Sequence, residues 1–73
     1  MRMLYFPDTD TLSIQFPLDR AVGQDTMDPD VTLFFDDANR ISEILVENAS
    51  RRLDLNGLRR EPQFEEIVSD VQS

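Results

Sequence analysis

The chain contains no histidine, cysteine, lysine or tryptophan. These absences remove the usual general base near neutral pH, the thiol nucleophile and the amine that forms Schiff bases. They also exclude disulfide bonds and remove the imidazole and thiolate ligands that zinc prefers. We therefore expect a protein that is not an enzyme and that holds no cofactor.

The small size of the chain favours association with another chain. Its 73 residues are enough for one small domain. A chain of this length buries only about 60% of the surface that its unfolded form exposes. Small domains compensate with disulfides, a structural metal or a partner, and the first two are excluded or unfavourable here. We expect a homo-oligomer, with a dimer as the first choice.

Charge is distributed unevenly along the chain, whose formal net charge is −8. Residues 1–47 carry a net −7, residues 48–60 a net +3 and residues 61–73 a net −4. A negative protein repels phosphate backbones, so nucleic acid is not an expected partner, whereas a small basic protein is. The opening apolar run ends at Pro7, too early for an export leader or a membrane span, so we expect a cytoplasmic protein without a membrane partner.

The first third of the chain predicts a β-hairpin. Residues 3–6 are apolar and rich in strand formers, and residues 7–10, Pro-Asp-Thr-Asp, are turn formers. In residues 11–16 polar and apolar side chains alternate, which places Leu12, Ile14 and Phe16 on one face of the returning strand. Residues 17–30 read as an irregular connection in which 24–27 could form a brief strand.

A second hairpin is predicted over residues 31–46, around a turn at 36–40. Asn39 lies where such a loop favours a left-handed residue, a conformation that asparagine tolerates well. Phe34, Ile44 and Val46 make this hairpin apolar on both faces, so both faces must be covered. One cover can be the chain's own helix, and the other a neighbouring subunit.

Two short helices are expected after the second hairpin. The first covers residues 49–56, with Asn48 or Ser50 as its N-cap, Gly57 at its end, and Ala49 and Leu53 facing the sheet.

The second helix is amphipathic and opens at Pro62. Its apolar residues recur at i, i+3, i+4 and i+7, namely Phe64, Ile67, Val68 and Val71. The predicted fold is therefore α+β, a small antiparallel sheet of two β-hairpins with three to four strands followed by one or two short helices. Residues 1–57 form the domain, and residues 58–73 are a docking segment.

With the turns placed, the chain resembles a family of small prokaryotic domains known as domain of unknown function 2283. The matching positions are Tyr5, Asp10, Leu12 and Ile14 in the first block, Asp28-Pro29 in the link, and Leu33, Asp36, Ile41, Ile44 and Ala49-Ser50 in the last block. The departures are Phe6 for an Asp, Asn39 for the turn Gly, and Leu45 where the family often has Glu. The resemblance covers residues 3–53 and concerns turn and core positions. It implies the same fold and, because members are sometimes encoded beside small basic toxin-like proteins, an antitoxin role.

Two aspartate pairs are the candidate polar sites. Asp8 and Asp10 lie in the first turn, and Asp36 and Asp37 in the second. If the two turns are adjacent, their carboxylates could bind Mg²⁺ or Ca²⁺, which take oxygen ligands. The alternative is that each Asp is there because its side chain bonds to the turn backbone.

Two arginine pairs are the candidate cationic sites, Arg51-Arg52 and Arg59-Arg60. They could grip phosphate or a partner's acidic groove. Alternatively, they form a solvated helix face and pair with Glu61, Glu65 and Glu66, within the chain or across a dimer.

These observations predict a non-enzymatic protein–protein interaction module that self-associates. Its sharpest form is an antitoxin-like partner of a small basic protein. The alternatives are a purely structural homo-oligomer and a divalent-metal-binding module or enzyme that uses the Asp-rich turns. The predicted interface residues are Phe34, Ile44, Val46, Phe64, Ile67, Val68 and Val71.

Overall fold

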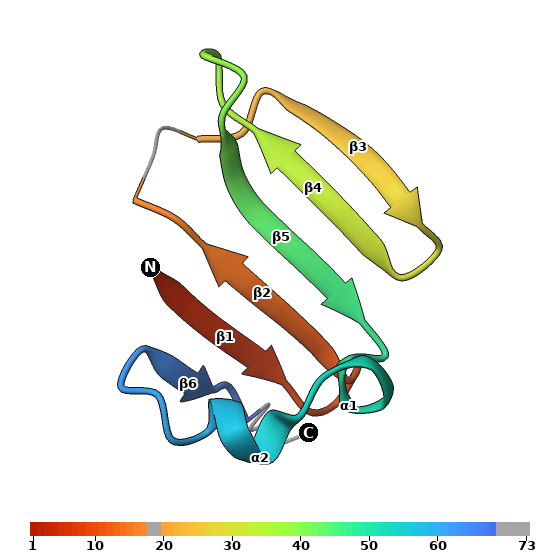
Figure 1. Cartoon of the computed structure of the whole chain (residues 1–73), viewed down its shortest axis with the longest axis vertical. Coiled ribbons are helices and arrows are strands. Elements are labelled where there is room, and N and C mark those ends of the chain that lie inside the picture. The colour runs from red at the N-terminus through yellow and green to blue at the C-terminus, as the bar shows by residue number, and fades with distance from the viewer. Residues whose placement is uncertain (18–19, 69–73) are drawn as a thin grey trace, which may run out of the picture.

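A computed structural model describes residues 1–17 and 20–68. Within these residues the protein is a small α+β fold with one six-stranded sheet and two short helices (Figure 1). The elements follow the chain in the order β1 (Arg2–Phe6), β2 (Thr11–Gln15), β3 (Gly23–Asp28), β4 (Val31–Phe35), β5 (Ile41–Glu47), α1 (Ala49–Arg52), α2 (Leu55–Leu58) and β6 (Phe64–Glu66). The α+β class and the short helices agree with the prediction.

The sheet has the strand order β3-β4-β5-β2-β1-β6. Both predicted hairpins are present, as β1–β2 and β4–β5, and they meet through antiparallel pairing of β2 with β5. The predicted brief strand at 24–27 is also present, as β3 at one edge. The expectation of three to four antiparallel strands is wrong, because β6 adds a sixth strand that runs parallel to β1.

Local turn chemistry fixes both hairpins. Asp10 adopts a left-handed φ of 54° at the end of the first turn, and Asn39 a φ of 63° in the second, as predicted for Asn39. Short polar side chains tolerate this conformation because they bond locally to the backbone. The β3–β4 turn is closed by Asp28, whose Oδ1 accepts hydrogen bonds from the amides of Asp30 and Val31.

The helical segment differs from the single helix predicted over 49–56. α1 ends at Arg52, because Leu53 is extended with φ −132° and ψ 154°. A second helix then begins, and Asp54 caps it by accepting a hydrogen bond from the Gly57 amide. Gly57 therefore lies inside α2 and does not end a helix. Neither Asn48 nor Ser50 provides the expected cap; Asn48 is left-handed and its side chain makes no cap bond.

The predicted C-terminal helix is also wrong over the residues that the structure describes. Residues 64–66 form β6, with Phe64 paired to Met3 and Glu66 to Tyr5. The Ile67 amide continues this pairing by donating to the Tyr5 carbonyl at 2.7 Å. A two-turn helix is marginally stable and would leave the backbone groups at the edge of β1 without partners. Pairing of β6 with β1 satisfies these groups. Residues 64–67 thus pair with the chain's own sheet, and Val71 falls outside the described residues.

The strand registers assign each side chain to one of two faces of the sheet. The helix face, covered by α1 and α2, carries the buried side chains of Met3, Tyr5, Leu12 and Val46, against which Ala49 packs. The open face, on the other side, carries Leu4, Ser13, Glu43, Leu45 and Phe34. Leu12 is 0% exposed and lies at the centre of the core.

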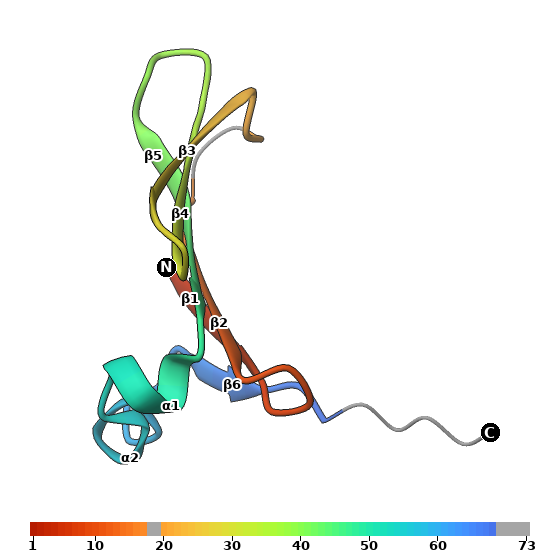
Figure 2. The same cartoon turned by 90° about the vertical axis from the view of Figure 1, so that its right-hand side faces the viewer.

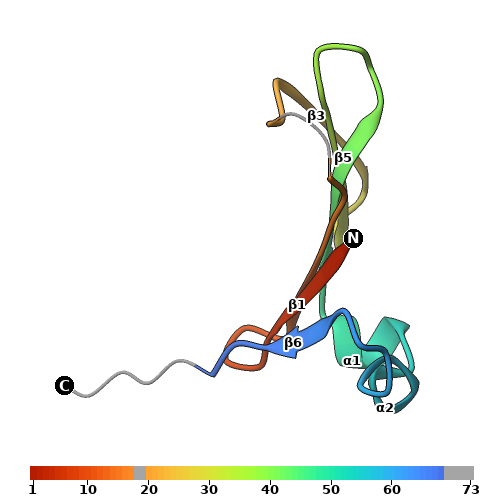
Figure 3. The same cartoon turned by 90° about the vertical axis from the view of Figure 1, so that its left-hand side faces the viewer.

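The helices cover only one end of the helix face. Figure 2 shows the sheet edge-on, with α1 and α2 packed at its lower end and the β3–β4–β5 end without a helix on either side. The opposite view in Figure 3 shows the same arrangement. No helix within the described residues has the length and apolar character needed to cross a bilayer.

Candidate functional site

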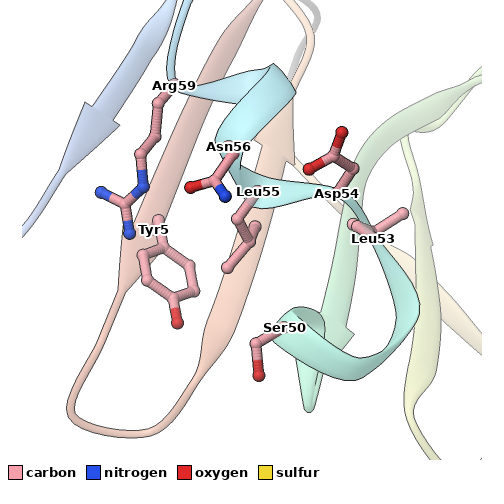
Figure 4. A pocket seen from close by; sticks show the side chains of 7 residues that line it. All are labelled: Tyr5, Ser50, Leu53, Asp54, Leu55, Asn56 and Arg59. Atoms are coloured by element: carbon pink, nitrogen blue, oxygen red, sulfur yellow. The ribbon is translucent and has the colours of Figure 1, made fainter.

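A polar pocket opens where the helices meet the sheet. It has a volume of about 340 Å³ and is lined by Tyr5, Ser50, Leu53, Asp54, Leu55, Asn56 and Arg59 (Figure 4). Tyr5 comes from β1, and the other lining residues from the helical segment. In Figure 4 the hydroxyls of Tyr5 and Ser50 lie at the same end of the pocket.

Asp10 organises this end of the pocket. Its Oδ1 accepts hydrogen bonds from the Tyr5 hydroxyl at 2.6 Å and from the Ser50 amide at 3.1 Å. Its Oδ2 accepts a third from the Ser50 hydroxyl at 2.6 Å, and its carbonyl accepts one from the Ala49 amide at 2.8 Å. Asp10 therefore accepts hydrogen bonds from the first amides of α1, in place of the predicted cap by Asn48 or Ser50, and holds the start of α1 against the first hairpin.

These hydrogen bonds shift the pKa of both acidic groups. The Ser50 hydroxyl, and then the Tyr5 hydroxyl, hold the pKa of Asp10 below its ordinary value of 3.8. The hydrogen bond to Asp10, together with burial, raises the pKa of Tyr5 above its ordinary value of 10.0. At neutral pH the cluster is a phenol and a hydroxyl that both donate to one carboxylate.

Arg59 closes the other side of the pocket. Its guanidinium lies 5.8 Å from the ring centres of both Tyr5 and Phe64, whose rings stack on each other at 6.3 Å. It also pairs with Glu66 of β6. This pair agrees with the expectation that the arginines pair with nearby glutamates within the chain, and it ties α2 to the edge strand.

The remaining arginines of the helical segment divide into two groups. Arg52 bridges α1 to the β3–β4 turn, with 3.2 Å ion pairs to Asp28 and Asp30. Arg51 and Arg60 are exposed and form no ion pair with any residue that the structure describes. Within the described residues, the helical segment therefore carries two exposed arginines that form no ion pair.

The predicted metal ligands are not brought together. The turn that holds Asp8 and Asp10 lies at the end of the sheet beside α1, and the turn that holds Asp36 and Asp37 lies at the other end (Figure 1). The two turns are not adjacent, because β2 pairs antiparallel with β5 and the loops leave at opposite ends. The condition for a metal site shared by the two aspartate pairs is therefore not met among the described residues. Among the described residues, no group of three or more acidic side chains is placed to hold a metal ion.

Asp36 illustrates the alternative role of these aspartates. Its side chain is 0% exposed, and its Oδ1 accepts hydrogen bonds from the amides of Ala38 and Arg40. Its Oδ2 pairs with the Arg40 guanidinium at 3.0 Å. The hydrogen bond from the Arg40 amide, and after it the one from the Ala38 amide, lower the pKa of Asp36 from its ordinary value of 3.8. Burial of the carboxyl acts in the opposite direction and is outweighed. Both oxygens are thus occupied by the turn to which Asp36 belongs.

Beyond the helices, the helix face carries a patch of half-buried apolar side chains. Cross-strand neighbours Leu12 and Val46 are 0% and 6% exposed under the helices. The next pair toward the far end, Ile14 and Ile44, is half-buried, as is Leu33 beside Ile44. We call Leu33, Ile44 and Ile14 the bare patch. Exposure rises along these strands because nothing in the described chain covers this end of the face.

The open face is more mixed. Phe34 and Leu45 add apolar area, so the second hairpin is apolar on both faces as expected. Between them and β1 lies a polar group, in which the buried Ser13 hydroxyl donates to Glu43 at 2.6 Å and accepts from Gln15. A face of this kind can meet water on one side of an antiparallel sheet.

The predicted interface residues occupy three environments. Val46 is buried in the core and Phe64 packs against it. Ile44 belongs to the bare patch, and Phe34 lies on the open face. Ile67 is half-buried at the edge, and Val68 is 67% exposed. Of the predicted interface residues that the structure describes, Ile44 and Phe34 thus lie on sheet surface that the helices leave uncovered.

Sequence reasoning missed the Asp10 cluster and the Arg59 stack. Both join residues far apart in the sequence, 40 positions for Asp10 and Ser50. Tyr5, Asp10 and Ser50 were among the positions quoted for the family resemblance, which was the one available signal.

The comparisons with known proteins bear on the first two thirds of the chain. The sequence pattern of the family described as "Protein of unknown function (DUF2283)" matches residues 2–50, more than half of the chain. The chain belongs to this family, as the resemblance over residues 3–53 indicated. Comparison with curated proteins and with solved structures finds no match.

Proposed function

We propose that this protein is a non-enzymatic protein–protein interaction module that self-associates, with a dimer as the simplest assembly. The observation that carries the proposal is the partial cover of the sheet, since α1 and α2 lie over one end of the helix face alone (Figures 2 and 3). The bare patch is continuous with the core, and removal of apolar surface from water is the main favourable contribution to most protein–protein association. A second copy supplies the missing cover.

The chemistry of the polar pocket supports a non-enzymatic role. Its two hydroxyls, from Tyr5 and Ser50, both donate to Asp10. A general base works best with a pKa near the working pH, whereas the pKa of Asp10 is lowered and that of Tyr5 raised. The cluster is better suited to fastening α1 to the sheet than to moving protons.

Sedimentation equilibrium of the purified chain tests self-association. The expected result is a mass that rises with concentration from the 8.5 kDa of one chain to a defined multiple of it. A mass of one chain at every concentration up to the millimolar range overturns the proposal. Leu33→Glu, in the bare patch, is the variant expected to stay monomeric while keeping its far-UV circular dichroism.

A second candidate is an antitoxin-like complex with a small basic protein. The net charge of −8, with Asp25 exposed in β3 and Asp37 exposed in the β4–β5 turn, favours such a partner through electrostatic attraction. The test is reconstitution from purified components, using a small basic protein encoded beside this one. A one-to-one complex that weakens as salt is raised supports this candidate, and separate elution of the two proteins at low salt overturns it.

A further inference from the structure

The two ends of the helix face differ in a complementary way. One end carries a layer of two helices (Figure 2). The other end carries the half-buried apolar side chains of the bare patch, over which neither helix lies. The helix layer itself exposes an apolar side chain, because Leu53 is 37% exposed where α1 gives way to α2. The helix end therefore has a covering layer, and the far end has apolar side chains that no helix covers.

We propose that two copies pack helix face against helix face, inverted end over end about a twofold axis, so that α1 and α2 of each copy cover the bare patch of the other. This inference rests on the proposed self-association and specifies which surfaces meet. In such an isologous dimer the same pair of surfaces meets twice, helix layer on bare patch and bare patch on helix layer. The helices of both copies would then form a central layer between the two sheets. Each helix would be buried on one side by its own sheet and on the other side by the sheet of the second copy.

The charges of the two ends are also complementary. Residues 48–60, which contain the helices, carry four arginines and one aspartate, a net +3. Residues 23–40 carry five aspartates and one arginine. Asp28 and Asp30 lie at the helix end, where they pair with Arg52. Asp36 pairs with Arg40, so the unpaired negative charge that remains within residues 23–40 is that of Asp25 and Asp37. On the helical segment Arg51 and Arg60 are exposed and form no ion pair within the described chain, and on the far end Asp25 and Asp37 are exposed. End-over-end inversion brings the two regions together, whereas a parallel arrangement sets like charge against like.

The size of the face is adequate for a stable dimer. The two longer extents of the molecule are 37 and 31 Å. A standard interface requires about 800 Å² from each partner, which a face of these dimensions can supply.

The open face is less suited to a second copy. Glu43 lies near its centre, with Phe34 as its direct cross-strand neighbour and Ser13 as its hydrogen-bond donor. A twofold contact on this face would bring two copies of this carboxylate into a drying interface. Burying such charges is costly.

Cysteine cross-linking tests the arrangement directly, because the natural chain has no cysteine. Leu53→Cys is mixed with a tagged copy that carries either Leu33→Cys or Phe34→Cys, and a short bis-maleimide is added. Leu33 and Phe34 are adjacent in β4 and point to opposite faces of the sheet, so they form a matched pair. We expect a covalent heterodimer between Leu53→Cys and Leu33→Cys and none between Leu53→Cys and Phe34→Cys.

Other outcomes separate this inference from the proposed function. If sedimentation shows an oligomer but cross-links form through Phe34→Cys alone, self-association stands and the end-over-end arrangement is wrong. If the mass is that of one chain, both fail. Circular dichroism and thermal melting of each cysteine variant confirm that the chains compared are folded. A dimer of this kind also dissociates more readily as salt is raised, because part of its attraction is screened.

Discussion

The Tyr5 hydroxyl donates a 2.6 Å hydrogen bond to the Asp10 carboxylate, which also accepts two hydrogen bonds from Ser50. This carboxylate joins β1 and the first turn to the start of α1, where Ser50 lies 40 positions after Asp10. Because Asp10 lies at one end of the first hairpin, it fixes the helix layer at that end of the sheet. The exposed apolar surface at the other end follows from where this anchor lies.

Removing the Tyr5 hydroxyl tests how strongly the anchor contributes to stability. Tyr5→Phe keeps the ring, its stacking on Phe64 and its contact with Arg59, and removes one hydrogen bond to Asp10. We expect the free energy of unfolding in urea to fall by about 1 kcal/mol. Ser50→Ala is the companion variant, because it removes the hydroxyl donor on the other side of the same carboxylate. The unfolding free energy lost in the double variant should differ from the sum of the losses in the two single variants, since both hydroxyls donate to Asp10. Strict additivity would contradict a shared anchor.

Acid should destabilise the protein through Asp10 and Asp36. The pKa of each is lowered in the folded protein from its ordinary value of 3.8. The folded state therefore binds the proton less readily than the unfolded chain, so the stabilisation is fully present above the ordinary pKa. It is lost as the pH falls below 3.8 and through the folded pKa. We expect the melting temperature to drop over this range, measured by circular dichroism.

Asp36→Asn isolates one of these contributions. The variant should melt at a lower temperature at neutral pH, and its melting temperature should depend less on pH in the acid range. Asp37→Asn is the matched control, because Asp37 is exposed in the same turn and its side chain makes no hydrogen bond within the described residues. Equal acid sensitivity in both variants would show that the Asp36 turn is not the origin of the effect.

The sequence predicted elements whose determinants are local. Alternation placed β2, and turn chemistry placed both hairpins and the left-handed Asn39. Prediction from the sequence failed where contacts with distant parts of the chain decide which element a segment forms. Phe64, Ile67 and Val68 fit a helix by spacing, but the open edge of β1 recruits their backbone into a strand. The Asp10 anchor was likewise hidden, because a turn aspartate gives no sign of which distant helix it will hold.

Phe64 tests whether β6 belongs to the core. Its ring packs against the core cluster and stacks on Tyr5, so Phe64→Ala should lower the free energy of unfolding by about 2 kcal/mol, less than for a fully buried phenylalanine. Val68→Ala is the control, since Val68 follows β6 and is 67% exposed, and it should change stability little. Urea titrations of the two variants make the comparison. Equal, small losses would mean that the edge strand is only loosely attached.

Asn39 tests whether its left-handed backbone is under strain. Asn39 has a φ of 63°, its amide donates to the Asp36 carbonyl at 3.0 Å, and its side chain is exposed. Any effect of substitution therefore comes from the backbone and not from lost packing. Asn39→Ala places a Cβ without a compensating polar group in the left-handed region and should cost about 1 kcal/mol. Asn39→Gly removes the Cβ and should keep or raise the melting temperature, although glycine also makes the unfolded chain more flexible. If the Asn39→Ala variant is as stable as the Asn39→Gly variant, the turn must be able to adopt another conformation. The hydrogen bond from the Arg40 amide to Asp36 would then have to change as well.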